Sequence, residues 1–309
     1  MQTPAPLLRQ ALPFQPPWHW HQFHAHFSLR RLPGVERVDE HGYTRSIRLG
    51  ELHSWFRVTP TPDALLLELP HEAAAAQADI ALRVRRMFDL DCDPLAVAAT
   101  LAQDEVLKPL LERHTGLRLP VAFDPFEQAV RTIIGQQVTV KAAVTIAGRL
   151  VERLGTPLPE SPDGLRLFPT PAAIAEDALP GIGMPGKRVE TLRRLAAAVA
   201  SGELELSLAD GVEAFQARLC ALPGIGPWTA QYIALRAFGD ADAFPTADLG
   251  LLKSPPLGCR RHQPTPARRT RRALATVARL RCRVPLAQLC NGDLTCTSAT
   301  TPAPSEPCC

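Results

Sequence analysis

Apolar and polar residues alternate in two stretches near the start of the chain, residues 42–49 and residues 54–70, and Gly and Pro bound both stretches. A period of two is typical of half-buried β-strands. The aromatic and His-rich segment before them, residues 18–32, can form a helix that ends before Pro33-Gly34. The pattern therefore predicts a small domain of antiparallel strands and helix over residues 1–87.

Apolar residues then recur at the helical period. Residues 72–104 are rich in Ala and look helical, and residues 124–155 give the clearest helix of the chain. In this second segment, Asp124 is a good N-cap, Pro125 suits the first helical position, and Glu127 occupies the third, as in a capping box. We expect one continuous helix here, closed by the glycine that follows it.

Two more helices are expected at about residues 185–200, with Gly202 as the C′ residue, and at residues 212–220. Together these segments predict an α+β fold. The small N-terminal antiparallel-sheet and helix domain is followed by an all-α domain over residues 88–254.

One signature occurs twice, about 43 residues apart, as LPGIGMPGKR (residues 179–188) and LPGIGPWTAQ (residues 222–231). Each copy has a short apolar lead, then Pro-Gly-apolar-Gly, then an amphipathic helix. Two copies are too few for a solenoid. The second copy joins two helices through a tight turn and therefore predicts a helix-hairpin-helix unit.

The turn of the second copy has the features of a phosphate site. Gly224 and Gly226 are free to take positive φ and let a ligand approach the backbone. The new helix begins near Pro227, whose missing N–H costs nothing there, and directs unpaired N–H groups and its positive dipole end at the ligand. Such a contact grips DNA phosphate and reads no base. A helix-turn-helix that only packs in the core can contain the same Pro-Gly-apolar-Gly sequence, so that alternative stays open.

Charge is uneven along the chain. Of the net charge of +3, residues 255–309 contribute a balance of +7, which leaves −4 for residues 1–254. Bulk charge thus gives no support to DNA binding by the main body, and local groups must supply it. The chain has no apolar run of about 20 residues, and its first residues lack the pattern of a signal peptide, so we expect a cytoplasmic protein and no membrane span.

Several motifs in order resemble one family. Residues 222–253 resemble the hairpin and catalytic loop of the helix-hairpin-helix DNA glycosylases. The wider chain, over about residues 14–254, resembles the DNA-3-methyladenine glycosylase II family, at PPWHWHQFHAHFSLRRLPGVERV, MFDLDCDP, FDPFEQAVRTIIGQQVTVKAA and FPTPAAIAEDALPGIGMPGKRVETL. The resemblance implies a base-excising hydrolase that acts on alkylated bases in double-stranded DNA.

The resemblance also implies a catalytic acid, Asp248, which lies 22 residues after Gly226. A carboxylate beneath the sugar can stabilise the oxocarbenium-like state or orient water. A helix N-cap is the alternative role for this residue. Relatives that also cut the DNA backbone have Lys where this chain has Trp228, and Trp offers no amine nucleophile. We therefore expect base removal alone; a lyase that uses another Lys is the alternative.

In the family, the positions of Trp228 and Tyr232 line the base pocket. These rings fall on one helix face, and a π face attracts a cationic alkylated purine. The alternative is a purely structural role, in which the two aromatic rings pack in the core. Ungapped alignment also places His26 at an aromatic pocket position, with Phe27 beside it. Four His at mixed spacings near residues 19–26, with no Cys or acidic partner nearby, do not indicate a metal site.

The resemblance assigns further residues to DNA and to an ion. Gln137 matches the wedge that fills the gap left by the extruded base, and Gln136 beside it can hydrogen-bond bases or backbone. The polar face of the capped helix is the alternative role for both. DNA contacts are also expected at the hairpin, from Gly224, Gly226, Pro227 and Thr229. No cofactor is expected to be required, although hairpins of this family often hold Na⁺ or K⁺ by carbonyl groups, here those of Cys220, Leu222 and Ile225.

Residues 255–309 do not resemble the family. They contain no Phe, Trp or Tyr, and six of the eight Cys lie between residues 259 and 309. Three interpretations compete: a shifted reading frame after about residue 254, a basic tail that binds DNA by charge, and a Cys/His metal element, for which no CxxC pair is present. The sequence predicts a monomeric, monofunctional glycosylase for alkylated purines, with a non-catalytic DNA-binding protein and an inactive truncated enzyme as alternatives.

Overall fold

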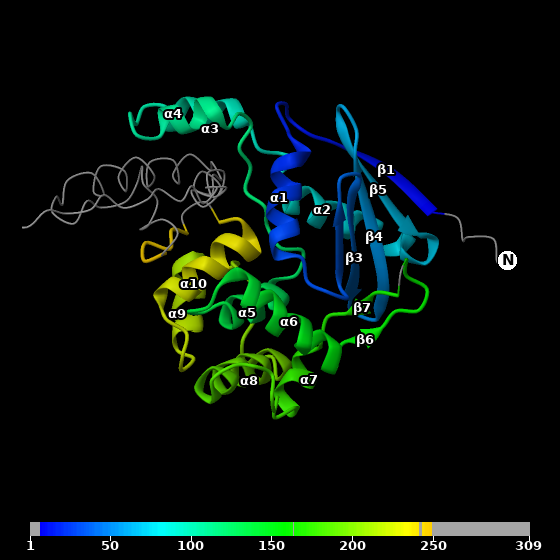
Figure 1. The fold of residues 1–309 in the computed structure, drawn as a ribbon, viewed down its shortest axis with the longest axis vertical. Coiled ribbons are helices and arrows are strands. Elements are labelled where there is room, and N and C mark those ends of the chain that lie inside the picture. Colours follow the sequence, from blue (N-terminus) through cyan, green and yellow to red (C-terminus); the bar gives the residue numbers. More distant parts are fainter. Residues whose placement is uncertain (1–6, 163, 241–242, 249–309) are drawn as a thin grey trace, which may run out of the picture.

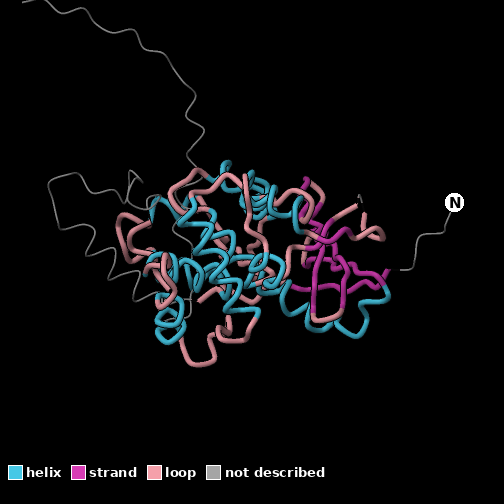
Figure 2. Tube along the Cα trace, turned by 90° about the horizontal axis from the view of Figure 1, so that it is seen from below, coloured by secondary structure: helices cyan, strands magenta, loops and turns pink. Residues whose placement is uncertain are grey.

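The computed structural model describes residues 7–162, 164–240 and 243–248 (Figure 1). The interpretation of residues 255–309 lies outside the described residues. Strands gather at one end of the molecule and most helices at the other (Figure 2). Among the described residues, no helix combines the length and the apolar character needed to cross a bilayer.

The N-terminal part is built on a five-stranded antiparallel sheet with strand order β1-β5-β4-β3-β2. Its strands are β1 (Leu7–Pro13), β2 (Glu36–Asp39), β3 (Gly42–Leu49), β4 (Leu52–Pro60) and β5 (Ala64–Pro70). The strand predicted at residues 42–49 is confirmed. The run at residues 54–70 divides into β4 and β5, because Thr61 turns the chain and its hydroxyl bonds both the backbone N–H and the carbonyl of Ala64. The edge strand β1 was not predicted.

Helices α1 (Trp20–Arg30) and α2 (Gln77–Met87) lie beside the sheet, and the 3₁₀-helix η1 (His71–Ala76) leads into α2 (Figure 1). Their buried rings form one core with the strands, in which Phe27 and Phe88 pack against Tyr43 at ring distances of 5.0 and 5.9 Å. Burial of this apolar surface fixes the orientation of α1 relative to the sheet. The helix predicted within residues 18–32 is thereby confirmed.

The second part is helical, apart from a hairpin of two-residue strands, β6 (Thr156–Pro157) and β7 (Arg166–Leu167). Its elements are α3 (Pro94–Leu101), α4 (Lys108–Arg113), α5 (Pro125–Ile134), α6 (Val140–Leu154), α7 (Pro171–Glu176), α8 (Gly186–Ala200), α9 (Val212–Cys220), α10 (Pro227–Ile233) and the π-helical turn η2 (Ala234–Phe238). The predicted α8, α9 and start of α10 are confirmed. The helix expected over residues 72–104 is interrupted between α2 and α3.

The expectation of one continuous helix over residues 124–155 is wrong. The helix stops at Gly135, Gln137 takes a φ of +57°, and Thr139 caps α6 by accepting the N–H of Ala142. A left-handed residue breaks the backbone ladder, and periodicity does not reveal it when the apolar face resumes in phase. Gln136 and Gln137 therefore lie on a turn between α5 and α6 and not on a helix face.

The cap predicted at the start of α5 is confirmed in part. The side chain of Asp124 accepts the N–H of Glu127 at 2.7 Å. The carboxylate of Glu127 does not complete a capping box, because it pairs with Arg45 and Arg131 instead. The fold thus uses this acid to join α5 to the N-terminal sheet.

Candidate functional site

The hairpin between α9 and α10 has the geometry expected of a phosphate-binding turn. Gly224 takes a φ of +92°, and a Cβ added there would lie 2.0 Å from the hydroxyl oxygen of Thr191 on α8. That hydroxyl also donates to the carbonyl of Pro223 at 3.1 Å. Gly226 is exposed, with open space around its missing side chain, although its φ of −100° needs no glycine. The turn is therefore held from behind by α8 and open in front, where the first N–H groups of α10 lie.

A cavity of about 1000 Å³ lies where α1 of the N-terminal part meets α5 and α10. Its wall includes the predicted pocket residues His26, Phe27, Trp228 and Tyr232 and the predicted acid Asp248. The fold thus brings His26 and Asp248, which are 222 positions apart in the sequence, to one site. A purine fits easily in this volume.

Two of the cavity's rings stack on each other. Trp228 and Tyr232 lie one helical turn apart on α10, with ring centroids 5.2 Å apart and an interplanar angle of 23°. The guanidinium of Arg236 lies 5.8 Å from the Tyr232 ring centroid. Burial alone would raise the pKa of Tyr232, but Arg236 and Arg30 outweigh it, so this pKa lies below its ordinary value.

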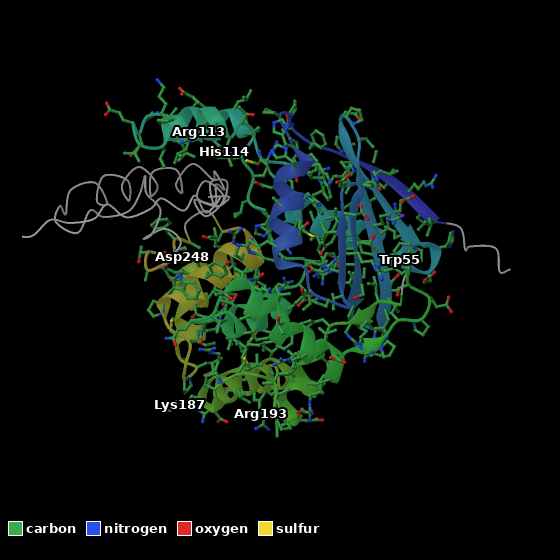
Figure 3. All side chains as sticks on the ribbon, in the orientation of Figure 1. Trp55, Arg113, His114, Lys187, Arg193 and Asp248 are labelled. Atoms are coloured by element: carbon green, nitrogen blue, oxygen red, sulfur yellow. The ribbon has the colours of Figure 1, made fainter. Side chains whose placement is uncertain are left out.

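Asp248 follows α10 and η2 and is half-buried at the cavity wall (Figure 3). Its backbone N–H donates to the carbonyl of Pro245 at 3.0 Å, which holds the preceding residues in a turn. The alternative role as an N-cap concerns a helix beyond residue 248 and lies outside the described residues. A carboxylate at the wall of a cavity lined by aromatic rings can stabilise positive charge on a sugar placed beside it.

The two glutamines of the α5–α6 turn have different environments. The side-chain amide of Gln136 donates to the carbonyl of Gly224 at 3.2 Å and to the hydroxyl of Thr229 at 3.0 Å. Gln137 is exposed at the cavity wall with its left-handed backbone. The side-chain N–H groups of Gln136 thus bind the hairpin, whereas Gln137 is the exposed residue of the turn. Their roles toward DNA stay predictions.

The carbonyl groups predicted to hold a cation occupy the hairpin. The carbonyl of Leu222 accepts the N–H of Ile225 at 3.1 Å, while those of Cys220 and Ile225 accept no backbone hydrogen bond of the turn. The cation itself stays a prediction. The part of the chain that the structure describes contains no group of three or more His, Cys, Asp or Glu side chains that would hold a metal.

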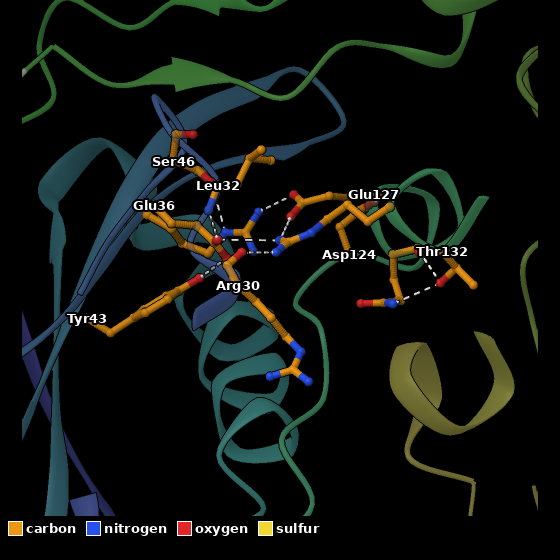
Figure 4. A network of polar contacts seen from close by, with 11 residues as sticks. Arg30, Leu32, Glu36, Tyr43, Ser46, Asp124, Glu127 and Thr132 are labelled. Carbon is orange, nitrogen blue, oxygen red and sulfur yellow. Dashed lines mark hydrogen bonds and ion pairs between the residues drawn. The ribbon is translucent and has the colours of Figure 1, made fainter. Parts of the chain in front are cut away.

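A buried ion network in the cavity wall was not predicted. Arg45 on β3 lies 2.5 Å from Glu127 and 3.7 Å from Glu36, and Arg131 on α5 lies 2.9 Å from Glu127 and 3.4 Å from Glu36 (Figure 4). Tyr43 donates to Glu36 at 2.7 Å. Burial alone would raise the pKa of Glu127, but the two arginines hold it below its ordinary value. The network joins the two parts of the molecule and fixes the cavity between them.

One signal in the sequence pointed to this network. Arg45 falls between the buried residues Tyr43 and Ile47 on one face of β3, and its side chain is only 4% exposed. A charge at an inward strand position requires a buried partner. The sequence does not show which acids supply it, because Glu36 and Glu127 come from separate elements.

Two family models match the chain. The AlkA N-terminal domain matches residues 9–124, and the HhH-GPD superfamily of base excision DNA repair proteins matches residues 130–278. The domain boundaries at residues 87 and 254 stay predictions.

Curated relatives agree with these matches. The chain is 36% identical over 241 residues to a Mycobacterium tuberculosis protein described as a probable bifunctional transcriptional activator/DNA repair enzyme AlkA; the match covers 78% of this chain and 49% of the relative. The chain thus spans about half the length of that relative. It is also 36% identical over 240 residues to DNA-3-methyladenine glycosylase 2 of Escherichia coli, with 75% of this chain and 82% of the relative covered.

Solved structures share the fold. A 3-methyladenine DNA glycosylase from Archaeoglobus fulgidus matches with a TM-score of 0.72 at 22% identity, covering 94% of this chain and all of that chain. MBOgg1 in complex with a low-affinity DNA ligand matches with a TM-score of 0.67 at 20% identity, covering 91% and 93%. With both family models matched in order and 36% identity over most of the E. coli relative, the chain belongs to the AlkA family of DNA-3-methyladenine glycosylases in the HhH-GPD superfamily.

Proposed function

We propose that this protein is a monofunctional DNA glycosylase that hydrolyses the N-glycosidic bond of alkylated purines in double-stranded DNA, in base excision repair. The observation that carries the proposal is the position of Asp248 and the stacked pair Trp228 and Tyr232 on one cavity, with the hairpin turn at its edge. E. coli DNA-3-methyladenine glycosylase 2 is the relative whose name supplies the lesion class.

The chemistry follows from these positions. The damaged base leaves the duplex, and Gln137 at the exposed tip of the α5–α6 turn fills the gap. Trp228 and Tyr232 hold the base by stacking. As the bond between the sugar carbon C1′ and the base nitrogen breaks, Asp248 stabilises the positive charge on the sugar. A water oxygen then bonds to C1′, and its proton is released, so that the products are the free base and an abasic site.

The hairpin positions the duplex. The N–H groups at the start of α10 bind a phosphate, and Gly224 and Gly226 let the backbone come close. Carbonyls of Cys220, Leu222 and Ile225 would hold a Na⁺ or K⁺ ion, which adds positive charge beside that phosphate. No cofactor takes part in the reaction. A monomer located in the cytoplasm is part of this proposal.

The test is release of 3-methyladenine from methylated duplex DNA, for the wild type and for Asp248→Asn. We expect the variant to lose release by at least about 100-fold and to keep its affinity for the duplex, since the hairpin is unchanged. Asp210→Asn, at an exposed acid that pairs with Arg218, is the control and should keep full activity. Equal release by Asp248→Asn would contradict the assignment of the acid. Binding without release by the wild type would identify a non-catalytic DNA-binding protein.

A further inference from the structure

The α5–α6 turn presents one polar side chain that the fold does not use. Gln136 donates its side-chain amide to the hairpin, and the Thr139 hydroxyl accepts the N–H of Ala142 to cap α6. Gln137 lies between them, and no described residue hydrogen-bonds its side chain. It is exposed at the wall of the cavity. Its side-chain carbonyl oxygen and N–H groups are therefore available to a ligand.

The backbone that carries this side chain is fixed. Gln137 takes a φ of +57°, which a non-glycine residue keeps only when its surroundings impose it. Before it, α5 ends in the fully buried Ile133 and Ile134, and after it the capped α6 begins. The bonds of Gln136 hold the turn to the hairpin. Because the turn is already placed before DNA binds, Gln137 has only its own side chain to order on binding.

Extrusion of a damaged base leaves its former partner with an unpaired Watson–Crick edge. A side chain that fills the gap shields this edge from water, and each buried donor or acceptor without a partner is costly. An alkylated adenine leaves thymine, whose edge has the N3–H donor between two carbonyl oxygens. A side-chain amide matches this edge, because its oxygen accepts the N3 proton while its N–H donates to a thymine carbonyl. An apolar side chain of equal length would fill the gap and leave these groups unpaired.

We propose that Gln137 hydrogen-bonds the Watson–Crick edge of the base opposite the lesion and is in this way a specificity-determining residue toward the undamaged strand. The inference rests on the proposed glycosidase function, in which Gln137 fills the gap. The hydrogen bonds form only after the damaged base has left the duplex, because that edge is otherwise paired. They therefore stabilise the extruded state relative to the paired state, and they do so without touching the base in the cavity.

The test is a double-mutant cycle between protein and DNA. The protein is the wild type or Gln137→Met, which keeps the length of the side chain without its hydrogen bonds. The duplex contains a tetrahydrofuran abasic-site analogue opposite thymine or opposite difluorotoluene, which has the shape of thymine without its hydrogen-bonding groups. The readout is Kd, so no bond is broken and the catalytic acid takes no part. We expect difluorotoluene to weaken binding of the wild type about tenfold more than binding of Gln137→Met.

The outcomes separate the two proposals. Each ratio of Kd values compares two duplexes for one protein, so it does not depend on the fraction of folded enzyme. If difluorotoluene weakens both proteins equally, the role of Gln137 toward the opposite base is overturned, while release of 3-methyladenine by the wild type keeps the glycosidase function standing. If the wild type releases no 3-methyladenine and binds the tetrahydrofuran duplex no more tightly than an undamaged duplex, the proposed function fails and this inference fails with it. A larger loss in the wild type than in Gln137→Met supports the inference.

Discussion

The side-chain amide of Gln136 lies 3.0 Å from the hydroxyl of Thr229, which is 93 positions later in the chain. A second bond from the same amide reaches the carbonyl of Gly224. These bonds connect the α5–α6 turn, which carries the exposed Gln137, to the hairpin that we expect to grip phosphate. The turn whose Gln137 we propose to fill the gap in the duplex is therefore fixed relative to the hairpin that we propose to bind phosphate.

Replacing Gln136 should uncouple the α5–α6 turn from the hairpin. Gln136→Leu removes both bonds, so we expect about a tenfold loss in base release, with a loss of stability of about 1 kcal/mol per bond at most. The rate of base release, from assays stopped at timed intervals, and urea unfolding measure the two effects. Gln22→Leu is the matched control, because Gln22 donates to the carbonyl of Thr115 far from the hairpin. Equal loss of release in both variants would count against a specific link between turn and hairpin.

The two glycines of the hairpin should respond differently to alanine. Gly224→Ala combines a φ of +92° with a Cβ 2.0 Å from Thr191, so we expect a loss of about 2 kcal/mol or more in the free energy of unfolding. Gly226→Ala meets no atom within 4 Å and needs no unusual φ, so the fold should keep its stability. Its methyl group faces the expected phosphate, so duplex affinity should still fall. Urea unfolding and DNA titration check this contrast, and an unchanged affinity in Gly226→Ala would place the phosphate elsewhere.

The ion network should make the fold sensitive to the loss of one acid. Glu127→Gln leaves Arg45 and Arg131 short of a partner in a buried site, so we expect a loss of about 3–5 kcal/mol in unfolding free energy. The folded state lowers the pKa of Glu127, so its contribution is present above the unfolded value of 4.5 and is lost as pH falls through the lower, folded value. Urea unfolding at pH 7 and at pH 4 measures both effects. Glu190→Gln, at the exposed pair with Arg194, should change stability by less than about 0.5 kcal/mol.

Alternation, capping residues and prolines in the sequence predicted the position of one strand and the start of two helices. Alternation located β3, the N-cap at Asp124 located the start of α5, and Pro227 located the start of α10. The break at Gln137 could not be predicted in this way, because a left-handed conformation at a non-glycine residue is imposed by tertiary contacts, here the bonds of Gln136 to the hairpin.

Motifs predicted the residues of the candidate site, but they did not predict the ion pairs and charges around it. The motifs named Trp228, Tyr232 and Asp248, and the structure brings all three to one cavity. The partners of Arg45 depend on how α5 docks against the sheet, which no local pattern encodes. The same holds for Arg30, whose guanidinium has no described acid beside it.

His26 should give the fold a pH dependence of its own. In the folded state its pKa lies well below 6.5, so below that pH the unfolded chain takes up a proton that the folded protein does not. Stability is therefore complete above pH 6.5 and falls as the pH drops toward the folded pKa, with a slope of up to about 1.4 kcal/mol per pH unit. Unfolding free energies at pH 7.5, 6.5 and 5.5 measure this slope. His26→Phe and His26→Asn both remove the titrating group and should both flatten the profile. A slope that persists in both variants would mean that another group excludes the proton, and His21, whose pKa is also lowered by burial and by His19 and His114, would be the next residue to replace.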